Sequence, residues 1–307
     1  MILHKNPVLR GASFVLAFIL LTVFSIGCQP AAEEEMPAEE PPGPVVLTEV
    51  WLLEEGLTHP ESVIYDAERS ALYVSNISFD GPGSITRVSA DGTTVDSMWV
   101  TDLNDPKGMA HGGDRLYVTD VNALLEIDLD SGEIMAEHVV EGDEVYLNDV
   151  TVGEDGAVYV SDSRYSKVYA LQDGAFGVWL EHDNVLVPNG VHVIGDELYI
   201  AAADSTAEEP GGARYLQAIS FADQRVRALH GTEPEGALDA IEPDGMGGLF
   251  VSDWGGGSLL HFRDGEGLTV LLTPGQGTAD VEFVADTQML YVPVMMSHQL
   301  IALKVSM

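Results

Sequence analysis

Polar side chains of the kinds that bind cations recur along this chain at a nearly constant distance before a short apolar phrase. They lie nine to eleven residues ahead of tripeptides such as Leu-Tyr-Val, and they are Glu61, Lys107, Asn148, Asp149, Asn189, Asp239 and Asp280. Carboxylate and amide oxygens are the ligands that Ca²⁺ takes, together with water. The spacing therefore predicts a divalent cation site, with Ca²⁺ favoured and Zn²⁺ or Mn²⁺ as alternatives. Because Asp and Asn also favour the ends of strands, turn formation is the competing explanation.

The apolar phrase occurs six times, and this repetition indicates the elements that must position those side chains. Its copies begin at residues 72, 116, 158, 198, 249 and 290. A period in the forties with short strands and polar turns is typical of β-propeller blades of about four strands each. We expect an all-β, six-bladed β-propeller over residues 46–307. Since the innermost strands of such a ring run in one direction, the polar positions should converge on one mouth of the central channel.

Blade three shows the expected local pattern most clearly. Residues 149–152, 157–161 and 167–171 read as its strands. Hairpin turns are expected at the Asp-Gly pairs that begin at residues 91, 155, 173 and 264. Residues 46–53, which precede the first repeat, are predicted to supply the outer strand of the last blade. That strand would close the ring and leave no free edge.

The composition excludes several classes of partner. Asp and Glu number 50 against 13 Lys and Arg, so the formal net charge is -37. Such a charge opposes binding to phosphate backbones and anionic lipids, and no nucleic-acid partner is expected. A salt-adapted or well-solvated surface explains it, and recruitment of cations is the alternative. We expect a monomer that acts on a small-molecule substrate.

The N-terminal residues indicate export. Residues 1–27 combine Lys5 and Arg10 with a following apolar run, which is typical of a secretory signal peptide. The sole cysteine, Cys28, follows small residues and resembles the lipidated cysteine of bacterial lipoproteins; an uncleaved membrane anchor is the alternative. Residues 28–45, rich in Glu and Pro, read as a disordered linker. We therefore expect a lipid-anchored protein of the bacterial cell envelope, outside the cytoplasm, that contacts the membrane only through its anchor.

Phrases at the polar positions resemble the senescence marker protein and gluconolactonase (regucalcin-like) family, a group of six-bladed, metal-dependent lactonases. They are His59-Pro60-Glu61-Ser62, Leu147-Asn148-Asp149-Val150, Pro188-Asn189-Gly190-Val191, and Leu238-Asp239-Ala240-Ile241 followed by residues 248–254. The resemblance spans residues 57–307. It implies that Glu61, Asn189 and Asp239 bind a divalent cation, and that Asn148 holds substrate or a water on the cation.

The resemblance also implies a function, namely hydrolysis of lactones or related esters. Together with the N-terminal residues it predicts an extracytoplasmic, lipid-anchored hydrolase. The cation would polarise the carbonyl while Asp239 takes a proton from the attacking water. Lys107, Asn148, Asp149 and Tyr146 are the expected substrate contacts, although turn capping or a rim salt bridge is the alternative for Lys107 and Asp149. The family has a basic residue where Tyr146 stands. The competing function is a non-enzymatic propeller that binds a small ligand or an envelope protein.

Overall fold

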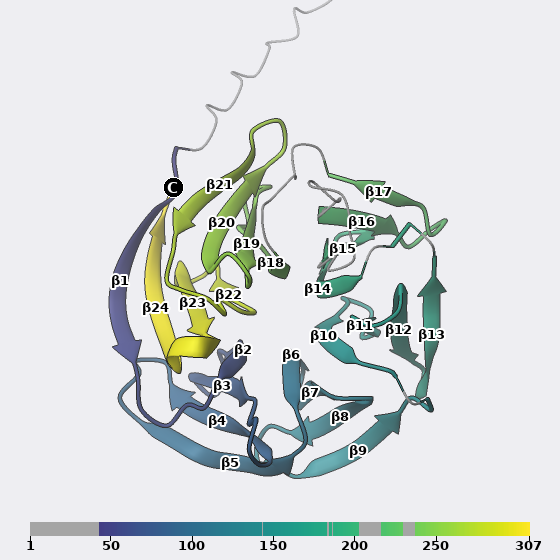
Figure 1. Ribbon diagram of the computed structural model, residues 1–307, viewed down its shortest axis with the longest axis horizontal. Coiled ribbons are helices and arrows are strands. Elements are labelled where there is room, and N and C mark those ends of the chain that lie inside the picture. Colours follow the sequence, from purple (N-terminus) through teal and green to yellow (C-terminus); the bar gives the residue numbers. More distant parts are fainter. Residues whose placement is uncertain (1–42, 143, 183, 186, 203–215, 230–236) are drawn as a thin grey trace, which may run out of the picture. The chain divides into compact units, whose positions relative to one another are not determined.

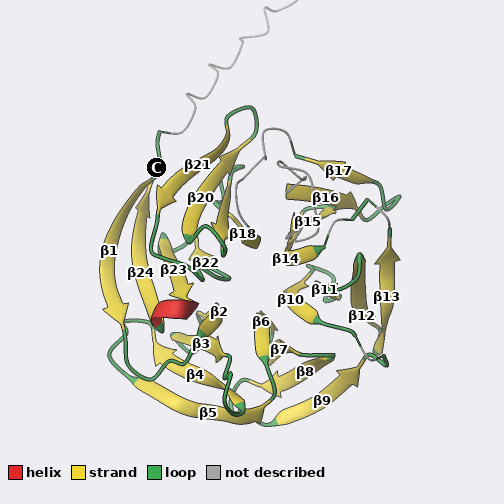
Figure 2. Cartoon of the chain, in the orientation of Figure 1, coloured by secondary structure: helices red, strands yellow, loops and turns green. Residues whose placement is uncertain are grey.

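The computed structural model describes residues 43–307 apart from 143, 183, 186, 203–215 and 230–236. In this part of the chain, 24 strands form six four-stranded antiparallel sheets around a central axis (Figure 1). The predicted six-bladed, all-β propeller is confirmed. Among the described residues, the one helical element is the single 3₁₀ turn η1 (Met295–Ser297), drawn in red in Figure 2.

The first three blades each contain four strands that are consecutive in sequence, named here from the axis outward. Blade 1 contains β2 (Pro60–Asp66), β3 (Ala71–Asn76), β4 (Gly83–Ser89) and β5 (Val95–Leu103). Blade 2 contains β6 (Pro106–Gly112), β7 (Arg115–Asp120), β8 (Ala123–Asp128) and β9 (Ile134–Val139). Blade 3 contains β10 (Leu147–Val152), β11 (Val158–Asp162), β12 (Lys167–Gln172) and β13 (Ala175–Glu181). The strands expected for blade three are therefore present.

The next two blades repeat this order, and the sixth differs in the origin of its outer strand. Blade 4 contains β14 (Pro188–Ile194), β15 (Glu197–Ala202), β16 (Leu216–Ser220) and β17 (Val226–Ala228). Blade 5 contains β18 (Leu238–Pro243), β19 (Leu249–Asp253), β20 (Ser258–Arg263) and β21 (Gly267–Leu272). Blade 6 contains β22 (Glu282–Val284), β23 (Met289–Val294), β24 (Gln299–Ser306) and β1 (Val46–Leu53).

Strand β1 closes the ring, as the sequence predicted. It pairs antiparallel with β24, from Val46 opposite Ser306 to Leu53 opposite Leu300. In Figure 1 the purple β1 lies outside the yellow β24 at the edge of blade 6. Hydrogen bonds between the two ends of the propeller therefore complete the last blade and cover the edge that β24 would otherwise expose.

The apolar phrases form the second strand of each blade, which explains why they do not alternate with polar residues. Every residue of β3, β11 and β19 is buried. Each sheet packs against a neighbouring sheet on both of its faces, so both sides of these strands face other blades. Inside them, the inner strands β2, β6, β10, β14, β18 and β22 form a ring of successive contacts around the axis.

A carboxylate or amide side chain at the end of the second strand holds the segment that enters the inner strand of the same blade. It accepts a hydrogen bond from the backbone of that segment in four blades. The pairs are Asn76 with Thr58, Asp120 with Asn104 and Asp105, Asp162 with Tyr146, and Asp253 with Ala237. Several of the segments held in this way lead directly into the polar positions of the channel mouth.

Replacing Asp120 tests this role. Its side chain is buried, and it accepts the backbone N–H groups of Asn104 at 3.0 Å and Asp105 at 2.6 Å. We expect Asp120→Ala to lower the free energy of unfolding by about 2–4 kcal/mol, because both donors lose a charged acceptor. Asp120→Asn keeps one acceptor and should lose about half as much. Urea denaturation measures both losses.

A matched control for this test is Asp96→Ala. Asp96 is exposed, and its ion pair with Arg87 spans 3.6 Å. Exposed pairs of this kind contribute about 1 kcal/mol or less. If Asp96→Ala proved as costly as Asp120→Ala, the buried hydrogen bonds of Asp120 would not be the cause of its effect.

Candidate active site

Most of the predicted site residues occur where the pairing of an inner strand is interrupted; Tyr146 and Asp280 instead lie just before β10 and β22. In β2, β6, β10, β14 and β18 the register with the second strand shifts after the first paired residue, and two residues stand unpaired. These pairs of residues are Glu61-Ser62, Lys107-Gly108, Asn148-Asp149, Asn189-Gly190 and Asp239-Ala240. A bulge of this kind redirects side chains that a regular strand would place on its two faces. The bulges bring polar groups from five blades to the axis.

Small residues and hydroxyl groups make these bulges possible. A β-carbon at Gly190 would overlap the carbonyl oxygen of Asp239, so the backbones of β14 and β18 can approach only because residue 190 is glycine. Hydroxyl groups of the second strands accept the N–H groups that the bulges release. The bonds run from Ser62 to Ser75, from Asp149 to Ser161 and from Ala240 to Ser252, at 2.8–2.9 Å.

A cavity of about 330 Å³ lies at the channel mouth and contains most of the predicted site. Six of the predicted residues border it, namely Glu61, Lys107, Tyr146, Asn148, Asn189 and Asp239. The remaining lining residues are Ile77, Phe79, Asp105, Ala237, Trp254 and Met295. The structure therefore places the three expected cation ligands and three of the expected substrate contacts around one space.

Lys107 carries the positive charge of this cavity. Its Nζ lies 3.9 Å from Glu61 Oε1 and 3.7 Å from Asp105 Oδ2. It also lies 5.1 Å from the centre of the Tyr146 ring, whose hydroxyl donates a hydrogen bond to Asp105 Oδ2 at 3.1 Å. Burial acts to lower the pKa of Lys107, but Glu61, Tyr146 and Asp105 outweigh burial and raise it. Lys107 is therefore protonated at neutral pH.

The two carboxyl groups beside Lys107 bind protons more tightly than carboxyl groups in water. Burial raises the pKa of Glu61 well above its usual value; Lys107 opposes this rise, and Asp239 and Asp280 add to it. Burial also raises the pKa of Asp239 to about 7, against the opposing effects of Lys107 and of a 2.6 Å hydrogen bond from Asn189 Nδ2. A carboxyl group that titrates near neutral pH is suited to accept and return a proton.

Two buried oxygen atoms of the cavity lack a hydrogen-bond donor. Glu61 Oε2 and Asn189 Oδ1 have no partner among the described residues. A buried acceptor left unpaired is costly, and a cation is one way to satisfy it. Across the described ranges, no three His, Cys, Asp or Glu side chains are placed to hold a metal, so a site here requires the amide oxygen of Asn189. Two carboxylates and one amide oxygen are a donor set that suits a hard cation such as Ca²⁺.

Asp149 and Asp280 do not border the cavity at the channel mouth with the other polar positions predicted from the sequence, but lie deeper in the channel. The two carboxylate oxygens of Asp149 accept the backbone N–H groups of Val150 and Val191, each at 2.7 Å, and so connect β10 to β14. Asp149 borders a second, smaller cavity of about 60 Å³ that also contains His192, Glu242, Asp280 and Glu282. The structure does not bring Asp149 into the cavity that holds Lys107, Asn148 and Tyr146.

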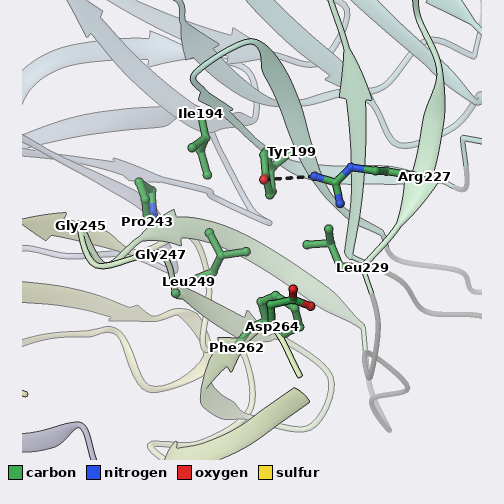
Figure 3. Close-up of a pocket in the computed structure, with 11 residues that line it drawn as sticks. Ile194, Tyr199, Arg227, Leu229, Pro243, Gly245, Gly247, Leu249, Phe262 and Asp264 are labelled. Atoms are coloured by element: carbon green, nitrogen blue, oxygen red, sulfur yellow. Dashed lines mark hydrogen bonds between the residues drawn. The ribbon is translucent and has the colours of Figure 1, made fainter. Parts of the chain in front are cut away.

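Another cavity, of about 420 Å³, lies elsewhere (Figure 3). It is lined by Ile194 and Pro243, at the ends of β14 and β18 opposite to those that carry Asn189 and Asp239. Its arginine, Arg227, donates to both carboxylate oxygens of Glu197 and to the Tyr199 hydroxyl, so its charge is already neutralised. This cavity is larger than the one at the channel mouth, but its lining residues do not bring several titratable groups together around one point.

Comparison with known proteins identifies the family. The model for the SMP-30/gluconolactonase/LRE-like region matches residues 59–295. The chain belongs to the SMP-30/gluconolactonase family. This match confirms the resemblance inferred from the four phrases and includes all of the residues that border the channel mouth. No curated protein matches the chain.

Solved structures related to this family member share its fold at low sequence identity. A gluconolactonase from Xanthomonas campestris is 20% identical, with a TM-score of 0.64 over 87% of this chain and 99% of that chain. A virginiamycin B lyase from Staphylococcus aureus is 14% identical, with a TM-score of 0.59 over 85% of this chain and 99% of that chain. A luciferin-regenerating enzyme is 14% identical, with a TM-score of 0.61 over 86% and 96% of the two chains. These similarities establish the propeller and do not identify a reaction.

The sequence-based predictions for the N-terminal residues fall largely outside the described part of the chain. The signal peptide, Cys28 and the linker up to residue 42 lie there and remain predictions. Within the described ranges, no helix has the length and apolar character needed to cross a bilayer.

Six cavity residues were not predicted as site residues from the sequence, and a positional signal could have found four of them. Phe79 and Trp254 follow the Ser-Asn and Ser-Asp pairs that end β3 and β19. Asp105 directly precedes β6, and Met295 directly follows β23. Residues flanking equivalent strand ends meet at the mouth just as the bulge residues do, so the same counting from the apolar phrase would have reached them.

The ion pair between His192 and Glu242 predicts a dependence of stability on pH. His192 Nδ1 lies 3.1 Å from Glu242 Oε2. Burial acts to lower the pKa of His192, but Glu242 and Asp280 outweigh burial and raise it. The stabilisation is therefore complete below the unfolded value of about 6.5 and is lost as pH rises through the higher folded value. Urea denaturation should show that His192→Gln costs most near pH 6 and least near pH 9.

His111→Gln is the control for this measurement, because His111 is exposed in β6. We expect it to leave the unfolding free energy unchanged at both pH values. A cost of His192→Gln that stayed constant between pH 6 and pH 9 would contradict the charged pair with Glu242.

Proposed function

We propose that this protein is an extracytoplasmic, lipid-anchored, metal-dependent hydrolase of lactones or related esters. The observation that carries the proposal is the pair of buried, unpartnered oxygens of Glu61 and Asn189, which line one cavity together with Asp239. Membership of the SMP-30/gluconolactonase family supports the class of substrate. The gluconolactonase of Xanthomonas campestris, which shares the fold, provides a precedent for lactone chemistry on this scaffold.

In this proposal Glu61, Asn189 and Asp239 hold a divalent cation, with Ca²⁺ preferred and Zn²⁺ or Mn²⁺ as alternatives. A bound cation supplies Lewis acidity, which polarises the substrate carbonyl and stabilises the negative charge that develops on its oxygen. The preference for Ca²⁺ follows from the donor atoms, which are all oxygens.

Asp239 acts as the base. It removes a proton from a water molecule as the water oxygen forms a bond to the acyl carbon. The bond between the acyl carbon and the ester oxygen then breaks, and the ester oxygen receives the proton from Asp239, so the product is a hydroxy acid or an acid and an alcohol.

Three further residues are placed to contact the substrate. The ammonium of Lys107 lies between Glu61 and Asp105, and it adds positive charge where the carbonyl oxygen becomes negative. Asn148 and Tyr146 border the same cavity and limit the positions that a substrate can take. Fixed groups of this kind accelerate a reaction by holding the reactants in the geometry of attack.

The competing proposal is a non-enzymatic propeller that binds a small ligand or an envelope protein. It rests on Lys107, whose ammonium already offsets part of the charge of Glu61. A channel mouth whose acidic groups are partly offset by its own lysine can be stable without a metal, and the propeller fold serves many functions. The two proposals differ in whether a metal stabilises the protein.

A thermal unfolding experiment distinguishes them. We expect EDTA to lower the melting temperature and added Ca²⁺, Mn²⁺ or Zn²⁺ to restore it, because a ligand that binds only the folded state stabilises it. Glu61→Gln should abolish this response. In a pH-stat assay with a panel of lactones, Asp239→Asn should lower kcat/KM by about 10²- to 10⁴-fold, which is the usual contribution of a general base.

Glu133→Gln is the matched control for the charge changes, because Glu133 is exposed in the turn between β8 and β9. It should alter neither the metal response nor the rate. A melting temperature that ignores both EDTA and metals, together with no lactone hydrolysis, would favour the non-enzymatic propeller. Hydrolysis that persisted unchanged in Asp239→Asn would remove Asp239 from the mechanism.

The proposed anchor has its own test. If Cys28 is lipidated in the bacterial cell envelope, the wild-type protein should fractionate with membranes and incorporate labelled palmitate. Cys28→Ser should move it to the soluble extracytoplasmic fraction without label, since a single apolar anchor provides the attachment. Membrane retention of Cys28→Ser would instead support an uncleaved N-terminal anchor.

A further inference from the structure

The cavity at the channel mouth is lined by both polar and apolar side chains. The polar ones include the charged and amide groups described above. The apolar ones are Ile77, Phe79, Ala237, Trp254 and Met295. Such a mixture is typical of pockets that take a molecule with an apolar body and a small number of polar groups.

Phe79 is the most exposed apolar group at this mouth. It lies three residues beyond the end of β3, and its side chain is 66% exposed. The ring nevertheless packs against that of His59, since their centres lie 4.5 Å apart, and the centre of the His59 ring lies 4.2 Å from that of His298. An aromatic ring held in this way at the edge of a cavity offers an apolar surface to a ligand.

The amide and phenol donors of the cavity are already engaged. Asn148 Nδ2 donates to Ser163 Oγ at 2.8 Å, and the Tyr146 hydroxyl donates to Asp105. Asn189 Nδ2 donates to Asp239 Oδ1 and to the carbonyl oxygen of Leu238. A sugar-acid lactone carries several hydroxyl groups, each of which needs a partner when it is buried. Apart from the ammonium of Lys107, the cavity therefore offers few donors for such hydroxyl groups.

The charge of the whole chain disfavours the approach of an anionic substrate. The formal net charge is -37, so an anion meets repulsion as it approaches the channel mouth. A volume of about 330 Å³ also limits the size of a ligand, since it lies near the lower end of the usual range.

We infer that the substrate is a compact, neutral lactone or ester that carries an alkyl or aromatic substituent, and that Phe79, Trp254 and Met295 bind this substituent. The inference rests on the proposed hydrolase function and names its substrate class. The reacting carbonyl lies beside the carboxyl and amide groups of the cavity, while the substituent lies against these apolar side chains and covers Phe79. A polyhydroxylated sugar-acid lactone is a poor substrate in this arrangement.

A series of lactones of increasing chain length tests the inference. With the wild-type protein and added metal, kcat/KM should rise from δ-valerolactone to δ-nonalactone by about fourfold for each methylene that the apolar side chains of the cavity bury. Glucono-δ-lactone should react more slowly than δ-nonalactone. A flat series, or a preference for glucono-δ-lactone, would overturn the inference and leave the proposed hydrolase intact.

Variants of Phe79 locate the contact. Phe79→Ala should lower kcat/KM for δ-nonalactone about tenfold or more and change that for δ-valerolactone by less than about twofold. Phe79→Leu should restore most of the loss. Met98→Ala is the matched control, because Met98 is 69% exposed on β5 and does not line the cavity. Equal losses on both lactones in Phe79→Ala would contradict a role in binding the substituent.

Binding of non-hydrolysable δ-lactams separates failure of the inference from failure of the proposed function. If no lactone is hydrolysed but an alkyl δ-lactam binds more tightly than unsubstituted δ-lactam by calorimetry, and Phe79→Ala removes the difference, the apolar site stands and the hydrolase does not. If lactones are hydrolysed but both lactams bind equally, the inference fails alone. Absence of hydrolysis and of lactam binding overturns both.

Discussion

Inner strands of neighbouring blades approach one another closely at the axis. In five of them the pairing with the second strand is interrupted at the equivalent position, directly after the first paired residue. The backbone groups released there are bonded to hydroxyl groups of the second strand, as for Asp149 and Ser161. Because the interruptions share one level, their side chains form a ring. Every polar interaction of the channel mouth depends on that shared level, and Gly190 shows how little space is left between neighbouring strands.

The channel concentrates acidic side chains where water is scarce, and its own groups offset the cost in different ways. Lys107 faces Glu61 at the mouth, while His192 faces Glu242 deeper in the channel. Asp149 is held by two backbone N–H groups. Burial also raises the pKa of Asp280 to about 8, although Ser62 donates a hydrogen bond to it. Protonation therefore relieves part of the repulsion that remains.

The sequence allowed the blades and much of the site to be predicted because both depend on local patterns. Each apolar phrase marks a strand buried on both faces, and the residues counted back from it fall in the bulges. The depth at which a side chain lies in the channel could not be predicted in this way, because it depends on how each of the two residues of a bulge is oriented. Asn148 and Asp149 are adjacent, yet only Asn148 borders the larger cavity. Phe79 and Met295 escaped notice because they flank strands and carry no chemistry of their own.

The position of β1 as the outer strand of blade 6 also determines where the polypeptide chain can be cut and rejoined without changing the fold. Val46 and Ser306 stand directly opposite each other in one sheet, so the seam of the ring lies inside a blade and its two sides are already joined by hydrogen bonds. The order of the blades around the axis does not depend on where the polypeptide is opened. A short peptide bridging the seam, with a new opening in a surface hairpin such as the one at Asp173-Gly174, would give a circular permutant with the same channel.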